Sequence, residues 1–243
     1  MFLLIDADIT MFKSVVAAEE EYDWGNDIFT LLADVKVAKD VFKQQLEHYQ
    51  NELKIDDFIC CLSDHTSNFR KDIEPTYKSN RKKTRKPVGY RALCDWIEEN
   101  YKTYRQPKLE ADDCLGILAT KPENVGQCVM VSMDKDLKTI PGRLFRPDNS
   151  ERLTITEEEA DKFFYIQALT GDSVDGYPGL KGCGPKTAEK ILGSRPDWSL
   201  VESAYVKNGY TVEDAITQAR LARILRWSDW DADKATVQLW KPN

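Results

Sequence analysis

Phe2-Leu-Leu-Ile-Asp-Ala-Asp8 opens the chain with a short apolar run that stops at an acid. Two later apolar runs stop in the same way, at Leu62-Ser-Asp64 and at Ser132-Met-Asp134. Short apolar runs bounded by polar residues are typical of buried strands. Because ligands bind at the carboxyl ends of the strands in open α/β sheets, we expect these acids to face one site.

The rest of the chain alternates predicted strands with predicted helices, which favours an α/β fold with a parallel-rich central sheet and helices on both faces. We expect strands over 2–5, 57–62, 127–132 and 152–156, and helices over 35–53, 90–101, 110–120, 156–169, 185–192 and 211–227. A helical C-terminal part is expected to begin near residue 157. The predicted division is an α/β core of residues 1–156 and a helical region of 157–243, packed as one compact unit.

Composition excludes several classes of protein. Of the 243 residues 42% are apolar, which is enough for a sizeable core and argues against disorder. Only two histidines are present, so His-rich zinc catalysis is excluded. The six cysteines form no CxxC pair, and we interpret them as reduced core residues of a cytoplasmic protein. The apolar N-terminal run is too short for a signal peptide or a membrane span.

Charge is concentrated in one segment. The chain has a net charge of −7, yet residues 70–86 hold eight basic and two acidic side chains. This pattern predicts an acidic body that holds metal cations and a cationic segment that holds a polyanion. Tyr77 could stack on a base while the cations hold phosphates, although a solvated charged face remains the alternative. The candidate DNA contacts in this segment are Arg70, Tyr77, Lys78, Arg81, Lys82 and Lys83.

Acids also occur in clusters, three within 110–113, two at 134 and 136, and two at 172 and 175. Taken singly, each could be a helix cap or a turn residue. Two carboxylates about 4 Å apart repel by roughly 4 kcal/mol at an effective dielectric constant of about 20, so their convergence requires bound cations or shared protons. Oxygen ligands indicate Mg²⁺ or Mn²⁺. Two such ions about 4 Å apart suit in-line displacement at a phosphodiester.

Residues 171–184 hold five of the twelve glycines, so a loop is expected there. Within it, Gly182-Cys-Gly-Pro-Lys-Thr187 leads into a helix and is typical of a helix–hairpin–helix element that binds the duplex backbone. A tight interhelical turn is the alternative. The candidate contacts here are Gly182, Gly184, Lys186 and Thr187.

Together these motifs resemble the 5′-nuclease (flap endonuclease-like) superfamily, and within it most closely the stand-alone 5′→3′ exonucleases of T7-type bacteriophages. The resemblance covers nearly the whole chain in order. It rests on Leu3–Asp8, Asp64 with Phe69-Arg70, Pro75–Arg81, Lys86–Tyr90, Leu109–Asp113, Ser132–Pro141, Gly171–Tyr177 and Gln218–Arg226. Residues 70–90 take the place of the family's arch, but this segment is short and interrupted at Pro87-Val-Gly89.

The resemblance implies roles for individual residues. Lys78 matches the lysine that contacts the scissile phosphate, Arg81 the arginine beside it, and Tyr77 an aromatic near the unpaired 5′ nucleotide. Asp134 and Asp136 are also expected to be catalytic, whereas Asp8 matches no firm role. The implied metal ligands are Asp6, Asp64, Glu110, Asp112, Asp113, Asp134, Asp136, Asp172 and Asp175.

The resemblance also implies an activity. It is Mg²⁺-dependent 5′→3′ cleavage of duplex DNA by a two-metal mechanism, with flap cutting, RNase H-like removal of RNA from RNA–DNA hybrids, and 5′-phosphorylated products. Mn²⁺ is expected to substitute for Mg²⁺, and K⁺ to bind at the helix–hairpin–helix. A monomer without membrane contact is expected, acting in the host cytoplasm if the chain is phage-encoded.

Two alternatives stand beside this interpretation. Asp6-Ala-Asp-Ile-Thr10 also fits the opening of a haloacid-dehalogenase-type phosphatase, with Asp6 as nucleophile and Asp8 as acid/base. That assignment leaves the acids at 110–113, the basic segment and the Gly-rich hairpin unexplained. A catalytically inactive DNA-binding protein on the same fold is the second alternative.

Overall fold

The computed structural model describes residues 1–83 and 85–242, without the side chains of Lys82 and Lys83. Its centre is a six-stranded sheet in the order β5-β4-β1-β6-β7-β8. The neighbours from β5 to β7 pair in parallel and only β8 runs antiparallel, at the sheet edge. The strands are β1 (Phe2–Asp6), β4 (Phe58–Cys61), β5 (Thr103–Tyr104), β6 (Cys128–Val131), β7 (Gly142–Arg146) and β8 (Glu151–Ile155).

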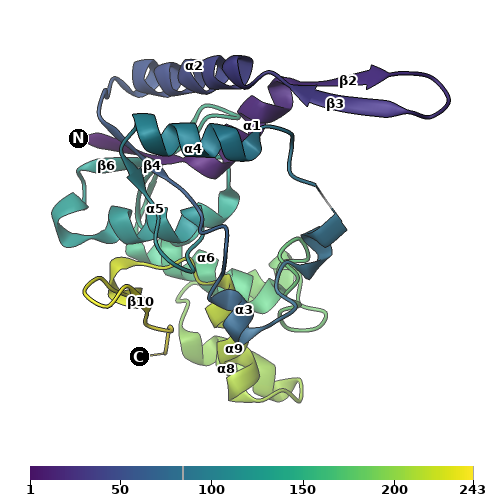
Figure 1. Cartoon of the computed structure of the whole chain (residues 1–243). Helices are drawn as coiled ribbons and strands as arrows, with labels where there is room; N and C mark the ends of the chain where they lie inside the picture. The colour runs from purple at the N-terminus through teal and green to yellow at the C-terminus, as the bar shows by residue number, and fades with distance from the viewer. Residues whose placement is uncertain (84, 243) are drawn as a thin grey trace.

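Helices cover both faces of this sheet, as predicted (Figure 1). Side chains of a strand alternate between the two faces. Leu3 and Ile5 therefore pack with α1 (Ala7–Ala17), α2 (Val35–Leu53) and α4 (Tyr90–Asn100), whereas Leu4 packs with α5 (Ala111–Thr120) and α6 (Glu157–Thr170). The α/β class and the parallel-rich sheet are confirmed.

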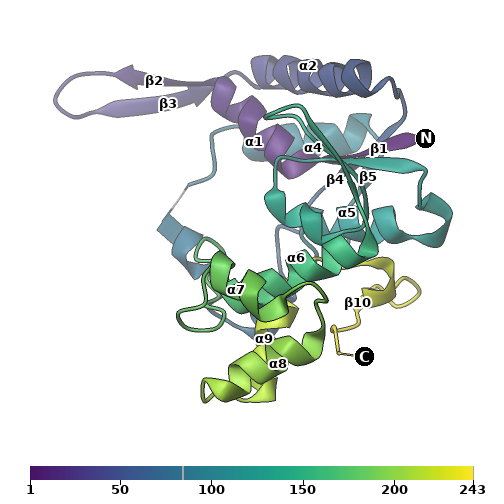
Figure 2. The same ribbon diagram turned by 180° about the vertical axis from the view of Figure 1, so that it is seen from behind.

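The C-terminal part adds three helices below the sheet (Figure 2). These are α7 (Pro185–Leu192), α8 (Trp198–Lys207) and α9 (Val212–Ala222), which pack with α6 around a third core. Beyond them, β9 (Trp230–Asp231) and β10 (Thr236–Val237) form a small hairpin. Ile224, Leu225 and Trp230 pack with α5 in the core of the α/β part.

The prediction of a helix through residue 227 is wrong. Helix α9 ends at Ala222, and Arg223 has extended backbone angles. The physical reason is a buried acceptor: the Leu225 N–H donates to the Asp113 carboxylate at 3.1 Å. This bond draws the backbone out of the helical path. The short 3₁₀ helix η4 (Trp227–Asp229) follows.

The antiparallel hairpin of β2 (Glu19–Asp23) and β3 (Phe29–Ala33) was not predicted, and neither was helix α1 before it. The hairpin projects from the body beside α1 and α2 (Figures 1 and 2). Its turn holds Asn26 and Asp27 in left-handed backbone conformations, which these residue types tolerate. Both strands expose large apolar side chains to solvent. They therefore lack the alternation of apolar and polar residues by which a half-buried strand is recognised in a sequence.

Segments between the main elements complete the fold. They are α3 (Arg70–Ile73) and the 3₁₀ helices η1 (Ser79–Lys83), η2 (Pro122–Asn124) and η3 (Lys135–Thr139). All six cysteines are buried and unpaired, in agreement with the interpretation from sequence. Across residues 1–83 and 85–242, none of the helices combines the length and the apolar character that crossing a bilayer requires.

Gly179 is the residue on which the Gly-rich loop depends most directly. Its φ is +62°, and a Cβ there would lie 2.2 Å from the Gly171 nitrogen. Gly209 shares the left-handed conformation but has open space around it. We therefore predict that Gly209→Ala lowers the free energy of unfolding by about 1 kcal/mol. Gly179→Ala should lower it by a further 1–3 kcal/mol, roughly the cost of overpacking. Equal losses in urea titrations would contradict this account.

Candidate active site

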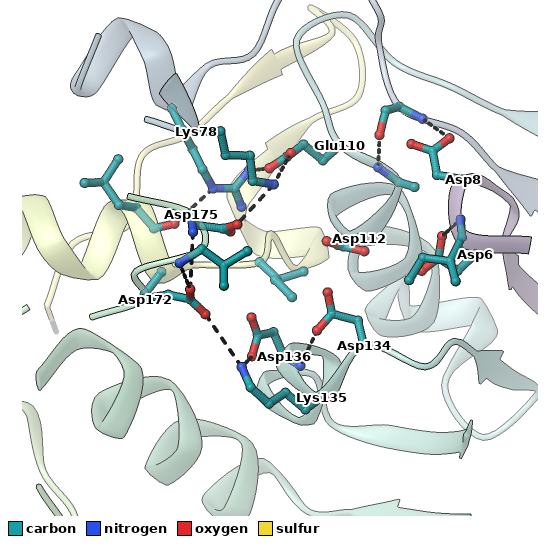
Figure 3. Close-up of a pocket in the computed structure, with 18 of the residues that line it drawn as sticks. Asp6, Asp8, Lys78, Glu110, Asp112, Asp134, Lys135, Asp136, Asp172 and Asp175 are labelled. Carbon is teal, nitrogen blue, oxygen red and sulfur yellow. Dashed lines mark hydrogen bonds and ion pairs between the residues drawn. The ribbon is translucent and has the colours of Figure 1, made fainter. Parts of the chain in front are cut away.

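A cavity of about 540 Å³ lies at the carboxyl ends of β1 and β6 and beside the start of α5. Carboxylates from four separate parts of the chain line it, as Figure 3 shows. Lys78, Arg81, Lys135, Arg70 and Arg146 line the same cavity. The acids in the lining are Asp6, Asp8, Glu110, Asp112, Asp134, Asp136, Asp172 and Asp175.

Asp6 and Asp134 are held by one serine. The Ser132 hydroxyl donates to the Asp6 carboxylate at 2.6 Å and accepts the Asp134 N–H at 3.0 Å. Asp6 also caps α1 by accepting the Ile9 N–H, and Asp134 caps η3 by accepting the Asp136 N–H. Since β1 and β6 are adjacent parallel strands, their ends bring these two acids to the same edge.

Glu110 and Asp112 enter from the start of α5. Glu110 forms the N-terminal cap of the helix. Its carboxylate pairs with the Lys78 ammonium and with Arg70 at 3.2 Å. The Asp112 carboxylate accepts no hydrogen bond from the part of the chain that the structure describes.

The loop after α6 supplies Asp172 and Asp175. Asp172 orders the loop by accepting the N–H groups of Val174 and Asp175. Asp175 pairs with Arg81 at 2.5 Å and with Lys78 at 3.6 Å. The Lys78 backbone is left-handed, with φ of 55°, and its N–H donates to the Asp175 carbonyl at 2.8 Å. The basic segment is thus bound to this loop through backbone and side chains.

Charge divides the cavity into two parts. Glu110, Asp136, Asp172 and Asp175 each pair with a lysine or arginine. Among the described residues, Asp6, Asp112 and Asp134 have no such partner. An unpaired buried carboxylate is costly, so this second part needs protons or bound cations.

The pKa values follow this division. Burial, together with the charges of Asp8 and Asp134, raises the pKa of Asp6 to about 7. Burial and the charge of Asp134 hold the pKa of Asp112 well above its usual range. Burial also acts on Glu110, but the charges of Lys78 and Arg70 outweigh it and lower its pKa to about 2.

Two of the predicted metal ligands lie outside the cavity. Asp64 organises its own loop by accepting the N–H groups of Thr66 and Lys108 at 2.8 Å each. Asp113 is fully buried and binds Arg70 through both carboxylate oxygens at 2.8 Å. In this structure their oxygens accept hydrogen bonds from other residues, and their role as metal ligands stays a prediction.

Two predicted DNA contacts are also buried. Arg70 is 3% exposed, and its guanidinium donates hydrogen bonds to Asp113, Glu110 and backbone carbonyls. Tyr77 is 2% exposed and donates its hydroxyl to Glu110 at 3.1 Å and to Asp175 at 3.0 Å. In this structure neither side chain is exposed to stack on a base or to bind a phosphate, and their roles as DNA contacts stay a prediction.

The remaining candidates differ in their placement. Arg81 is half-exposed at the cavity, and the side chains of Lys82 and Lys83 lie outside the described residues. Gly182, Gly184, Lys186 and Thr187 are exposed together before and at the start of α7. Ser132, Lys135 and Arg146 are site residues that sequence reasoning missed. Only Lys135, between two candidate acids, carried a signal.

The carboxylates that line the cavity are chemically suited to bind a divalent cation. Carboxylate oxygens are the ligands that Mg²⁺ and Mn²⁺ prefer, and the half-buried Asp112 has no cationic partner among the described residues. Within residues 1–83 and 85–242, no group of three or more acids, histidines or cysteines is arranged to hold one ion as it stands.

A parallel sheet whose strand ends direct carboxylates and a lysine into one cavity is suited to metal-assisted hydrolysis of phosphate esters. Comparisons agree. The family described as "5′-3′ exonuclease, N-terminal resolvase-like domain" matches residues 1–162. The chain therefore belongs to the 5′–3′ exonuclease family, and it is an enzyme, a 5′→3′ exonuclease. The phosphatase alternative and the inactive scaffold are set aside.

Individual relatives support this membership. The exonuclease of Escherichia phage T7 is 32% identical over 99% of this chain and 93% of its own length. The exodeoxyribonuclease of Enterobacteria phage T3 is 30% identical over 99% and 92%. In fold, the chain is similar to the T5 D15 protein co-crystallised with metal ions, with a TM-score of 0.62 at 15% identity, covering 92% of this chain and 89% of that one.

Asp6 makes stability depend on pH when metal is absent. Its pKa is about 7 in the folded protein against 3.8 for an ordinary aspartate, so the folded state binds more protons between these values. Stability should therefore fall as pH rises from about 4 to about 7. We predict that Asp6→Asn removes part of this fall, measured as the difference in Tm between pH 5 and pH 8 in EDTA. The exposed Asp95→Asn is the control, and identical profiles for all three proteins would refute the assignment.

Proposed function

We propose that this chain is a Mg²⁺-dependent 5′ nuclease that acts on duplex DNA ends and on flaps, with RNase H-like activity on RNA–DNA hybrids. The observation that carries the proposal is the convergence of eight carboxylates, from residue 6 to residue 175, on one cavity that Lys78 and Arg81 also line. Such an arrangement is suited to cations and a polyanion together.

The positions of the carboxylates along the cavity, rather than their ion pairs, suggest which residues would hold metal. Asp6, Glu110, Asp112 and Asp134 would hold one ion, and Asp136, Asp172 and Asp175 would hold a second. When bound, such ions activate water and stabilise the leaving oxygen of an in-line displacement. Mn²⁺ would substitute for Mg²⁺, because both prefer oxygen ligands.

The chain's own cations act on the substrate. Lys78 now pairs with Glu110 and Asp175, and Arg81 with Asp175. When a phosphate enters the cavity, these two side chains would turn to it and offset the charge that develops on its oxygens. Water would attack the phosphorus in line and the 3′ oxygen would leave with a proton. The products would be a 5′ phosphate and a 3′ hydroxyl.

The Gly-rich hairpin before α7 would hold the duplex away from the cut. A Cβ at Gly182 or Gly184 would meet nothing within 4 Å, so intramolecular packing does not require glycine at either position. Small residues there leave room for a DNA backbone against exposed N–H groups. A K⁺ ion at the hairpin carbonyls, a monomeric state and a host-cytoplasmic location complete the proposal.

The acids are tested together with a matched control. We expect Asp134→Asn with Asp136→Asn to lower the single-turnover cleavage rate at least about a hundredfold, the scale of losing an electrostatic stabiliser. Duplex binding should persist. The exposed Asp95→Asn should cleave normally. Duplexes labelled at the 5′ or the 3′ end, with Mg²⁺, Mn²⁺ or EDTA, give rate and polarity. Wild-type rates in the double variant, or cleavage in EDTA, would reject the site.

The hairpin is tested by binding. Lys186 is exposed at the start of α7, so Lys186→Ala should weaken duplex binding and flatten the log–log salt slope by about 0.9 per phosphate contact. Lys207→Ala, at the end of α8, serves as the control for a general loss of charge. Binding isotherms between low and moderate salt distinguish them. An unchanged slope in Lys186→Ala would remove the hairpin from the interface.

A further inference from the structure

The basic segment is attached at its far end by an acid outside the active site. Glu19 stands at the base of the β2–β3 hairpin, where it pairs in register with Ala33. Its carboxylate accepts two hydrogen bonds from the Arg85 guanidinium, at 2.5 and 2.9 Å. It also accepts the Val88 N–H at 2.7 Å. One side chain thus fixes both the guanidinium and the backbone of the segment.

Residues 80 and 81 of the basic segment are attached to the loop that follows α6. The Asn80 amide donates to the carbonyls of Ser173 and Val174, at 3.0 and 3.2 Å. Arg81 adds its ion pair with Asp175. Only three residues separate Arg81 from Arg85.

The Glu19 contact is stronger than an ordinary surface ion pair. A planar guanidinium that donates two parallel bonds to one carboxylate has a defined geometry and strong charge-assisted hydrogen bonds. The side chain of Glu19 is only 16% exposed. Hydrogen bonds from Arg85 and then Val88 lower the pKa of Glu19 to about 2, so the carboxylate stays ionised across working pH.

We propose that Glu19 is a positioning residue that holds the C-terminal end of the basic segment and thereby favours DNA with an unpaired 5′ end. With Arg81 and Arg85 both attached, the positions of these two residues are fixed before DNA arrives. The segment then loses less conformational entropy on binding a single strand. This inference rests on the proposed function for its substrate and adds a residue outside the cavity to it.

Limited trypsin digestion of the DNA-free full chain tests the attachment directly. Glu19→Gln removes the charge, and Arg85→Lys keeps charge and cleavage site but cannot make the bidentate contact. Each should raise the cleavage rate at bonds between residues 78 and 86 about tenfold, because charge-assisted hydrogen bonds of this kind no longer oppose opening. Glu20→Gln, on the opposite face of the hairpin, is the control and should not change the rate.

Steady-state kinetics on two kinds of DNA test whether this attachment affects the choice of substrate. In Glu19→Gln and in Arg85→Lys, KM should rise for DNA with unpaired 5′ nucleotides more than for blunt duplex, with kcat retained at saturating DNA. The double variant should be no worse than either single variant. An unchanged trypsin rate, a lowered KM, or equal effects on both substrates would each overturn the inference. If the wild-type chain does not cleave DNA at all, the proposed function fails, while the digestion still decides whether Glu19 holds the segment.

Discussion

The buried Arg70 guanidinium is the interaction on which the site's geometry depends. It donates to Asp113 twice, to Glu110, and to the carbonyls of Leu221 and Arg223. These bonds join α3, the start of α5 and the end of α9. Since a buried charge is tolerated only when it is paired and hydrogen-bonded, the C-terminal helices cannot shift without exposing or orphaning Arg70. Together with Lys78, whose charge has the larger effect, the same guanidinium lowers the pKa of Glu110 and keeps it ionised.

The acids of the cavity are therefore not equivalent. On one side, protein cations neutralise Glu110 and Asp175, and these pairs are the ones a phosphate can exchange with. On the other side, Asp6 and Asp112 repel each other and gain protons or cations from solution. If protein cations neutralised every acid, the cavity would not bind a metal ion, and if none were neutralised, it would repel DNA. The separation allows one cavity to attract both.

Pattern and spacing predicted much of the architecture and most of the cavity acids. The strand ends at Asp6 and Asp134 converge because adjacent parallel strands leave them no alternative. What the pattern could not show is the direction in which neighbouring acids point. Asp112 faces the cavity while Asp113, one residue on, turns inward to Arg70, a difference set by a partner 43 residues away. Tyr77 was similarly placed by long-range contacts, and the solvent-facing β2–β3 hairpin had no buried face to reveal it.

The burial of every cysteine has a consequence for the protein in use. Burial raises the pKa of the Cys60 thiol to about 12 and the pKa of Cys128 to about 11, and the six sulfurs are all enclosed. Because the thiolate is the reactive form, oxidation and alkylation of these thiols are disfavoured on the intact fold. Modification of the cysteines is thus expected mainly in copies that have already opened, so it would report loss of structure.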